Sequence, residues 1–159
     1  MIETAEFRRV LGHFATGVTV VTTLRGEGLP CGLTANAFSS VSLEPRLVLV
    51  CVDKGADSHD CIRAAGVFAV NMLSEGKGET LARRFAGCET EEKFVGVAFH
   101  AEQTGAPVLD DALAWLDCRV TQEVDAGDHT VFLGEVMAAE TTEGTPLLYY
   151  RGGYGRFAP

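Results

Sequence analysis

The sequence has few basic residues, no long hydrophobic run and no signal-peptide pattern among its first residues. Its 13 Lys and Arg residues face 22 Asp and Glu residues, which gives a formal charge of -9. The average surface therefore repels polyphosphate backbones and anionic membranes. No window approaches the 18 apolar residues of a membrane span, and the N-terminus lacks the basic start and apolar stretch of a signal peptide. We expect a cytoplasmic protein with neither nucleic acid nor membrane as a partner.

The common metal-binding and nucleotide-binding motifs are missing as well. The five cysteines are odd in number, widely spaced and free of any CxxC pair, so neither a disulfide framework nor a metal site is predicted. A GxGxxG after a strand and a GxxxxGK[ST] loop are both lacking, which argues against Rossmann and P-loop sites. A phosphate-bearing cofactor stays open, because a few N–H groups and one basic side chain can hold an anion locally.

What is present fits one folded domain over residues 1–159, with 47% hydrophobic and 22% charged residues. Apolar periodicity predicts short helices, over residues 4–14, 57–66 and 78–87. β-branched and apolar runs predict strands, over residues 18–24, 30–36, 46–52 and 67–73, the third of them buried on both faces. A Gly127-Asp128 turn predicts a hairpin of two long strands, over residues 112–127 and 129–143. The strands do not alternate regularly with helices, so we predict a mainly β fold with short helices, built as a closed or partly closed barrel.

The most informative segment is GLTANAFSSVSLEP, residues 32–45, which sets small polar side chains beside strands of core composition. Five such residues fall in it: Thr34, Asn36, Ser39, Ser40 and Ser42. Side chains of this kind often only satisfy backbone groups at a turn or face solvent on an edge strand. They can equally hydrogen-bond a planar, polar ligand that lies across the strand. The residues alone leave both interpretations open.

The longer run GLTANAFSSVSLEPRLVLVCVDKGADSH resembles the short-chain flavin reductases. In that family, a Gly-x-Thr-Ala-Asn/Ser-x-Phe-Ser/Thr-Ser-Val-Ser-Leu-Asp/Glu-Pro run precedes an apolar strand and a polar helix start. The likeness covers essentially the whole chain, including FRRVLGHFATGVTVVTT, FAVNML, LARRFAG, GDHTVFLGEV and PLLYYRGGYG. It implies an FMN-binding split β-barrel, usually a homodimer. It also implies an enzyme that uses NADH or NADPH to reduce FMN or FAD and releases the reduced flavin to a separate monooxygenase.

The resemblance further implies which residues contact the cofactors. Residues matching positions along the flavin ring, the ribityl chain and its phosphate are Thr34, Ala35, Asn36, Phe38, Ser39 and Ser40. The following strand end, loop and helix start contribute Cys51, Val52, Asp53, Lys54, Ser58 and His59. A later segment that touches the flavin from the same or the second subunit comprises Phe85, Ala86 and Gly87. The terminal YRGGY, near the nicotinamide, contributes Tyr150, Arg151 and Tyr154, and Arg151 could also meet a pyrophosphate there.

Lys54 and His129 carry the sharpest expectations. A helix start beside a hydroxyl and the Lys54 ammonium could bind phosphate. The loop DKGADSHD holds three Asp where many relatives carry extra Arg or Lys, so phosphate binding is expected to be weaker or to lean on N–H groups. The alternative for Lys54 is a solvated amine. In the family, the Gly-Asp-His that ends at His129 lies by the nicotinamide, so we expect His129 to orient the hydride donor; the alternative is a hairpin turn residue.

The remaining expectations concern packing and rival functions. Cys51 is expected to be a wall residue rather than a nucleophile, because the local sequence shows no basic neighbour. Tyr149 is assigned to the core, and Trp115 to the core or a dimer contact. Two rival functions stay open: a flavin-binding electron carrier or sensor, and a flavoprotein that keeps FMN bound and reduces another substrate.

Overall fold

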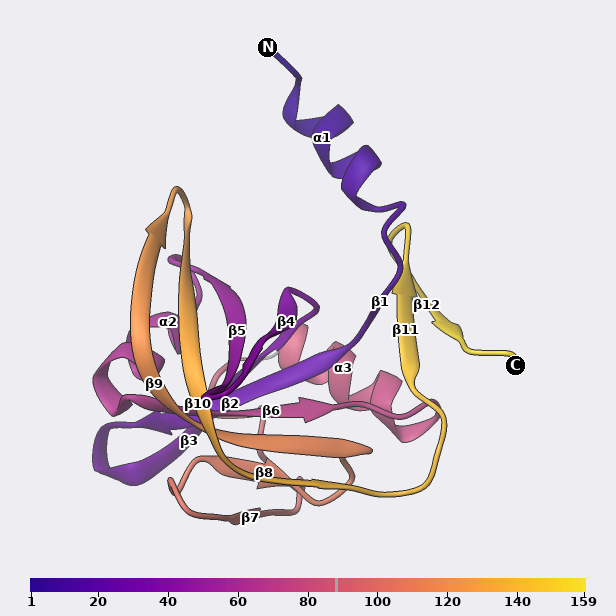
Figure 1. The fold of residues 1–159 in the computed structure, drawn as a ribbon. Helices are drawn as coiled ribbons and strands as arrows, with labels where there is room; N and C mark the ends of the chain where they lie inside the picture. The colour runs from indigo at the N-terminus through magenta and orange to yellow at the C-terminus, as the bar shows by residue number, and fades with distance from the viewer. Residues whose placement is uncertain (88) are drawn as a thin grey trace.

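The computed structural model describes residues 1–87 and 89–159 and is built around one seven-stranded antiparallel sheet (Figure 1). Its strands follow the order β3-β2-β6-β9-β10-β5-β4. Their bounds are β2 Thr19–Arg25, β3 Leu29–Ala35, β4 Phe38–Leu43, β5 Arg46–Asp53, β6 Val67–Met72, β9 Ala114–Ala126 and β10 His129–Thr141. Six of these strands overlap predicted strands and β4 lies in the polar segment 32–45, so the mainly β prediction is confirmed.

Smaller elements surround this sheet. The helices are α1 Thr4–Leu11, α2 Asp57–Ala65 and α3 Lys77–Gly87, with a 3-10 turn η1 at Gly26–Gly28. A three-stranded sheet joins the two ends of the chain, with β1 Thr16–Gly17, β11 Leu147–Tyr150 and β12 Gly153–Arg156. A two-stranded sheet pairs β7 Phe99–Ala101 with β8 Pro107–Leu109. None of the helices among the described residues is both long and apolar enough to span a bilayer.

The main sheet curls around one hydrophobic core without closing. Val21 of β2, Val50 of β5 and Phe132 of β10 meet in this core, and Ile62 of α2 covers it. Leu33 of β3 and Phe38 of β4 also pack against it, although β3 and β4 are the two edge strands at opposite ends of the sheet. A sheet whose two edges contribute to the same core is a partly closed barrel, as the sequence predicts.

The prediction that residues 46–52 are buried on both faces is wrong. Along β5, burial alternates: Val48, Val50 and Val52 are buried, whereas the opposite face is only partly so. Two side chains of that opposite face, Leu49 and Cys51, border a cavity instead of another layer of protein. The apolar composition of β5 therefore serves a core on one side and a pocket wall on the other.

The β9–β10 hairpin forms the long arm predicted from its turn (Figure 1). Gly127 takes a φ of 68° at the tip, a left-handed conformation that favours glycine. His129 begins β10, where it lies opposite Ala126 on one side and Asp53 of β5 on the other. The hairpin thereby places His129 at the end of β5.

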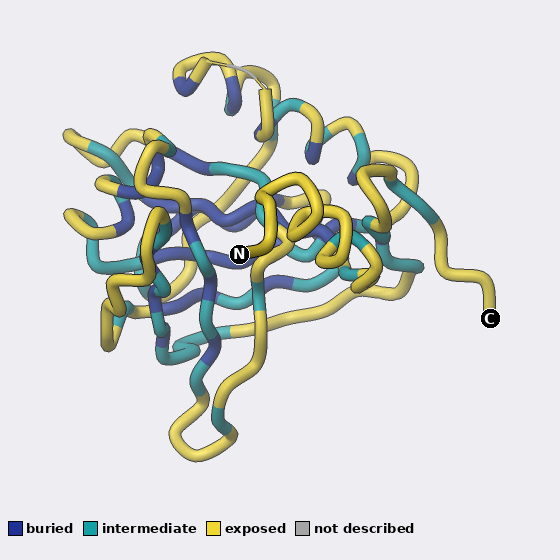
Figure 2. The backbone as a smooth tube through the Cα atoms, turned by 90° about the horizontal axis from the view of Figure 1, so that it is seen from above, coloured by how far each residue is buried: buried dark blue, intermediate teal, exposed yellow. Residues whose placement is uncertain are grey.

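Helix α1 extends away from the body of the molecule (Figure 1) and is exposed along its whole length (Figure 2). Its apolar side chains include Phe7, Val10 and Leu11, all at least half exposed, and Phe14 beyond its end is 79% exposed. The predicted amphipathic helix is confirmed, but no part of the described chain covers its apolar face. A backbone hydrogen bond from Arg151 N to Gly12 O, 3.0 Å long, ties the end of α1 to the β11–β12 turn.

Candidate functional site

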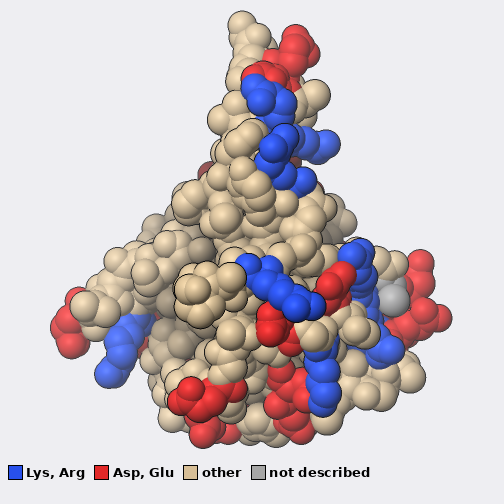
Figure 3. Space-filling view, turned by 90° about the vertical axis from the view of Figure 1, so that its right-hand side faces the viewer, with Lys and Arg blue, Asp and Glu red and all other residues tan. Residues whose placement is uncertain are grey.

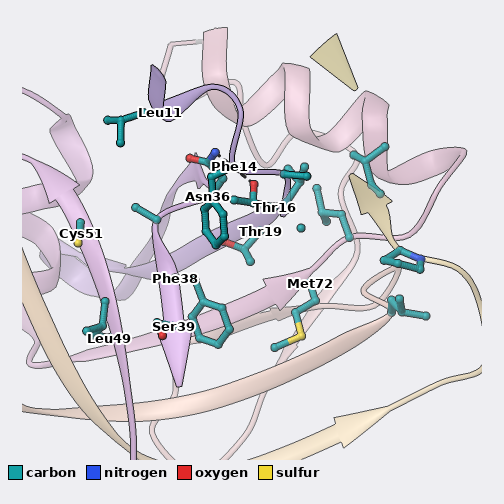
Figure 4. A pocket seen from close by; sticks show the side chains of 18 residues that line it. Leu11, Phe14, Thr16, Thr19, Asn36, Phe38, Ser39, Leu49, Cys51 and Met72 are labelled. Atoms are coloured by element: carbon teal, nitrogen blue, oxygen red, sulfur yellow. Dashed lines mark hydrogen bonds between the residues drawn. The ribbon is translucent and has the colours of Figure 1, made fainter. Parts of the chain in front are cut away.

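A cavity of about 710 Å³ lies where the β3–β4 connection faces the end of α1 (Figure 4). We call it the main cavity. Its walls come from the chain after α1, from residues 36–39, from the partly exposed face of β5 and from the end of β6, and include Phe14, Thr16, Thr19, Asn36, Phe38, Ser39, Leu49, Cys51 and Met72. Its volume lies in the range of about 300–1,000 Å³ that is usual for small-molecule sites.

The lining is mostly apolar with a few polar groups. Thr19 Oγ1 donates to Ala35 O at 2.6 Å, and Asn36 Nδ2 donates to Thr16 Oγ1 at 3.3 Å, so these contacts brace β3 against β2 and the chain after α1. Ser39 Oγ donates to Ser40 O at 2.9 Å. Apolar walls with scattered hydroxyl and amide groups suit a flat aromatic ring with polar edges. The polar segment 32–45 therefore forms a pocket wall at residues 36–39, and its hydrogen bonding to a ligand stays a prediction.

A second cavity of about 210 Å³ adjoins the main one and shares Val18 and Asn36 with it. The rest of its lining is Thr34, Ala35, Ala86, Tyr149 and Tyr154. The Tyr154 ring is fixed from two sides, because the Arg83 guanidinium lies 5.0 Å from its centroid and the Tyr149 ring meets it edge-on at 5.6 Å. Tyr149 packs against the core, as predicted, and it also lines this cavity, a role that was not predicted.

The two cavities together bring into one place most of the residues of segment 34–40 that were predicted to lie along the flavin. Asn36, Phe38, Ser39 and Cys51 line the main cavity, and Thr34, Ala35, Asn36, Ala86 and Tyr154 line the second. The Thr34 hydroxyl is already engaged, because Oγ1 donates to Ala82 O of α3 at 2.6 Å. Burial raises the pKa of the Cys51 thiol, which suits the wall role expected for it.

Other predicted residues are buried in the protein instead. Val52 belongs to the core under the sheet, and Phe85 packs edge-on against Phe94 with centroids 5.0 Å apart. Ser58 is 1% exposed and receives a contact from Cys31 Sγ at 3.4 Å. His59 is 3% exposed; its Nε2 lies 2.8 Å from Thr130 Oγ1 of β10 and its Nδ1 lies 2.8 Å from Asp60 Oδ1. In this arrangement, the Ser58 and His59 side chains join α2 to the sheet.

The loop after β5 is closely tied to the β9–β10 hairpin. Lys54 Nζ donates to the Asp125 carboxylate and to Gly127 O, the latter at 2.7 Å. The hydrogen bond from Lys54 is the main reason that the pKa of Asp125 is lowered. Asp53 Oδ1 accepts a hydrogen bond from Gly55 N at 2.7 Å. The Lys54 ammonium is thus exposed to solvent but engaged by the hairpin, and it is not free for phosphate in this structure.

His129 lies just beyond the Cys51 edge of the main cavity. Cys51 pairs with Val131 of β10, and His129 is two residues farther along that strand, a distance of about 7 Å at the usual strand rise. Its Nδ1 is 2.7 Å from Asp128 Oδ1, and this hydrogen bond lowers the pKa of Asp128. Asp128 therefore holds the imidazole at the hairpin tip, and its role towards the nicotinamide stays a prediction.

The remaining predicted residues lie on exposed backbone near these cavities. Ser40 is exposed on β4, and Gly87 is exposed at the end of α3. Tyr150 is 47% exposed and meets the His13 ring edge-on at 6.2 Å. Arg151, in the β11–β12 turn, has a φ of 49°. Trp115 was predicted to lie in the core or at a dimer contact. It is 8% exposed and belongs to a core cluster of this chain.

Sequence reasoning missed several lining residues, among them Phe14, Thr16, Leu49 and Met72. The one available signal was Phe14, which continues the apolar face of α1. Leu49 and Met72 read as core strand residues because periodicity shows which face is apolar but not what lies opposite. Within residues 1–87 and 89–159, no group of three or more His, Cys, Asp and Glu side chains is placed to hold a metal ion.

Comparison with known proteins gives these cavities a family context. The model of the flavin reductase like domain matches residues 11–158. The reductase component of 4-nitrophenol 4-monooxygenase/4-nitrocatechol 2-monooxygenase from Rhodococcus opacus is 44% identical over 158 residues, covering 99% of this chain and 83% of that protein. Flavin reductase PheA2 in its native state superposes with a TM-score of 0.89 at 43% identity, covering 99% of this chain and 100% of that one.

A second solved structure is the NADH:FAD oxidoreductase SgcE6 of Streptomyces globisporus in complex with NAD and FAD fragments. It gives a TM-score of 0.90 at 42% identity, covering 99% of this chain and 94% of that one. The chain therefore belongs to the flavin reductase-like family and has its split-barrel fold. Its activity class is that of an NAD(P)H:flavin oxidoreductase.

Proposed function

We propose that this protein uses NADH or NADPH to reduce FMN or FAD and releases the reduced flavin to a separate monooxygenase. The observation that carries the proposal is the main cavity, formed by Asn36, Phe38, Ser39 and Cys51 in a chain that matches flavin reductases over nearly its whole length. The Rhodococcus opacus relative is itself the reductase component of a monooxygenase. The Streptomyces globisporus relative is an NADH:FAD oxidoreductase.

The residues present fit a flavin. Phe38, Leu49 and Cys51 offer apolar contact to a ring, and Asn36 with Ser39 offers polar groups at its edge. Ala35, Ala86 and Tyr154 continue the site into the second cavity. When both cofactors are bound, they supply the hydride transfer themselves, so the task of the protein is to position them and to exclude water.

The nicotinamide side of the site is proposed to include His129, Tyr150 and Arg151. Asp128 fixes the His129 ring through Nδ1, which leaves Nε2 as the atom that could meet a carboxamide. Tyr150 and Arg151 lie in the turn beside α1. These residues would orient the hydride donor rather than exchange a proton with it.

The flavin phosphate is proposed to lie towards Ser40 and the loop after β5. Because Lys54 is engaged by Asp125 and Gly127 O, a phosphate there must either draw Lys54 away or rely on backbone N–H groups. The Ser58 and His59 side chains are buried, so they would shape the loop from beneath. This agrees with the expected reliance on N–H groups in a loop with three Asp.

We also propose a cytoplasmic homodimer. A single copy leaves a set of large apolar side chains exposed: Phe7 50%, Val10 51%, Leu11 54%, Phe14 79% and Leu43 88%. Exposed apolar surface of this kind on a projecting helix is characteristic of an interaction site. Leu11 and Phe14 also line the main cavity, so a second copy covering α1 would complete a wall of the site. Light scattering on the purified protein distinguishes a dimer from a monomer.

The enzymatic proposal is tested by steady-state kinetics on flavin-stripped protein. The absorbance of NADH or NADPH is followed while FMN or FAD is titrated in. Saturable dependence of the rate on added flavin supports a reductase that treats flavin as a substrate. Flavin that stays bound with ping-pong kinetics towards another acceptor would favour the flavoprotein alternative. Flavin binding without any turnover would favour a carrier or sensor.

A further inference from the structure

A third hollow, of about 570 Å³, runs between α1 and the β11–β12 turn. Its lining includes Arg8, Gly12, Asn36, Tyr149 and Arg151, and we call it the basic groove. Asn36 also lines both cavities described above, and Tyr149 lines the second. The basic groove is therefore a continuation of the proposed cofactor site.

The groove is locally cationic in a protein whose formal charge is -9. Among the described residues that line it there are three arginines and no Asp or Glu. Arg9 is neutralised by Glu6, which it contacts at 2.7 and 2.8 Å. Within residues 1–87 and 89–159, neither Arg8 nor Arg151 takes part in an ion pair. Figure 3 shows Lys and Arg side chains gathered on α1 where it meets the body.

Backbone hydrogen bonds join the two segments that carry Arg8 and Arg151. Gly12 N donates to Arg8 O at 2.9 Å, and Arg151 N donates to Gly12 O at 3.0 Å. Gly12 thus links the helical turn that carries Arg8 to the hairpin turn that carries Arg151. Arg151 and Gly152 form the two-residue loop of the β11–β12 hairpin, with φ values of 49° and 83°, as a tight hairpin turn of this length requires.

We propose that Arg8 and Arg151 bind the diphosphate group of a dinucleotide whose ring lies in the adjoining cavities. Two arginines that make no ion pair within residues 1–87 and 89–159, on segments joined by backbone hydrogen bonds, suit this ligand, because arginine makes paired, charge-assisted hydrogen bonds to phosphate oxygens. The proposal rests on the proposed reductase function and extends the site from Arg151, which the family resemblance already places near the cofactors, to Arg8 of α1. The dinucleotide is NAD(P)H or FAD, and the test below separates these two sources.

The test compares Arg8→Gln with the control Arg119→Gln. Arg119 is an exposed residue of β9 that lines none of the three hollows and that, in the described chain, has no ion pair. Dissociation constants are measured by calorimetry for ADP, for FMN and FAD, and for NADH and reduced nicotinamide mononucleotide. Circular dichroism confirms that α1 and the fold persist in both variants.

Arg8→Gln is expected to weaken ADP binding about tenfold, because a hydrogen bond to a charged group is lost. If the nicotinamide cofactor occupies the groove, the same loss of affinity should appear for NADH but not for reduced nicotinamide mononucleotide. If the flavin occupies it, the loss should appear for FAD but not for FMN. Arg119→Gln should match the wild type in every titration. Raising the salt concentration should narrow the difference between wild type and Arg8→Gln.

Equal affinities of wild type and Arg8→Gln for ADP, NADH and FAD would overturn the proposal. If the affinities are equal but the wild-type protein oxidises NADH when flavin is added, the groove proposal is wrong and the reductase function is still supported. Conversely, if ADP binding depends on Arg8 but the protein does not oxidise NADH with added flavin, the groove proposal is supported and the proposed reductase function is wrong. The two failures are thereby distinguished.

Discussion

The Thr34 hydroxyl provides a sharp test of which groups in the polar segment serve the ligand and which serve the fold. The family resemblance places Thr34 along the flavin, yet its Oγ1 donates to Ala82 O at 2.6 Å and ties β3 to α3. Thr34→Val keeps the side-chain shape and removes this bond. The net loss of one such hydrogen bond is about 1 kcal/mol, which lowers the Tm of a domain of this size by about 2–4 °C.

The assay pairs thermal unfolding of the flavin-free protein with a flavin titration. Thr34→Val should be destabilised while its affinity for flavin stays within about twofold of the wild type, because the hydroxyl is occupied inside the protein. Thr23→Val is the matched control, since Thr23 Oγ1 donates to Val67 O at 2.7 Å and lines neither cavity. A tenfold loss of flavin affinity in Thr34→Val, with unfolding unchanged, would refute the reasoning.

Three further predictions concern the core and the cysteines. Gly134→Ala should lower the free energy of unfolding by about 1–3 kcal/mol, because a Cβ there would lie 2.5 Å from Phe68 Cζ. Urea unfolding measures this, and Gly155→Ala, which meets nothing within 4 Å, should stay near the wild type. Alkylation of Cys51, followed by mass spectrometry, should slow when flavin is added; an unchanged rate at saturating flavin would place the ligand elsewhere. Burial, with a smaller contribution from the Asp117 carboxylate, raises the pKa of Cys118 to about 12. The folded chain therefore keeps a thiol proton that the unfolded chain loses above about pH 8.5. Stability should therefore fall between pH 8.5 and 12, by up to about 1.4 kcal/mol per pH unit from this thiol, and less steeply in Cys118→Ala; equal slopes would contradict this.

Much of the scaffold could be predicted from signals that are local in the chain. The Gly127-Asp128 turn predicts the hairpin that carries His129, and the structure forms it at that place. The polar run allows a pocket wall, the family resemblance favours it, and Asn36, Phe38 and Ser39 line the main cavity. These features depend on neighbours in the chain, which is why a single sequence can reveal them.

Features that depend on distant partners could not be predicted in the same way. Lys54 is held by Asp125, which lies 71 positions away, and His59 by Thr130 at the same separation. Local sequence shows neither partner, so both side chains were assigned to a phosphate loop. The apolar strand β5 was expected to be buried on both faces, because composition records the hydrophobicity of a wall but not whether protein or ligand covers it.

The central claim, that the main cavity holds the flavin ring, is tested most directly by one pair of tryptophan variants. Leu49 and Leu47 lie on the same partly buried face of β5, but only Leu49 lines the cavity. Flavin binding is measured by fluorescence titration of Leu49→Trp and Leu47→Trp. We expect Leu49→Trp to bind about tenfold more weakly or worse, since overpacking costs about 1–3 kcal/mol, and Leu47→Trp to bind as the wild type does. Equal affinity in the two variants would contradict the placement of the flavin.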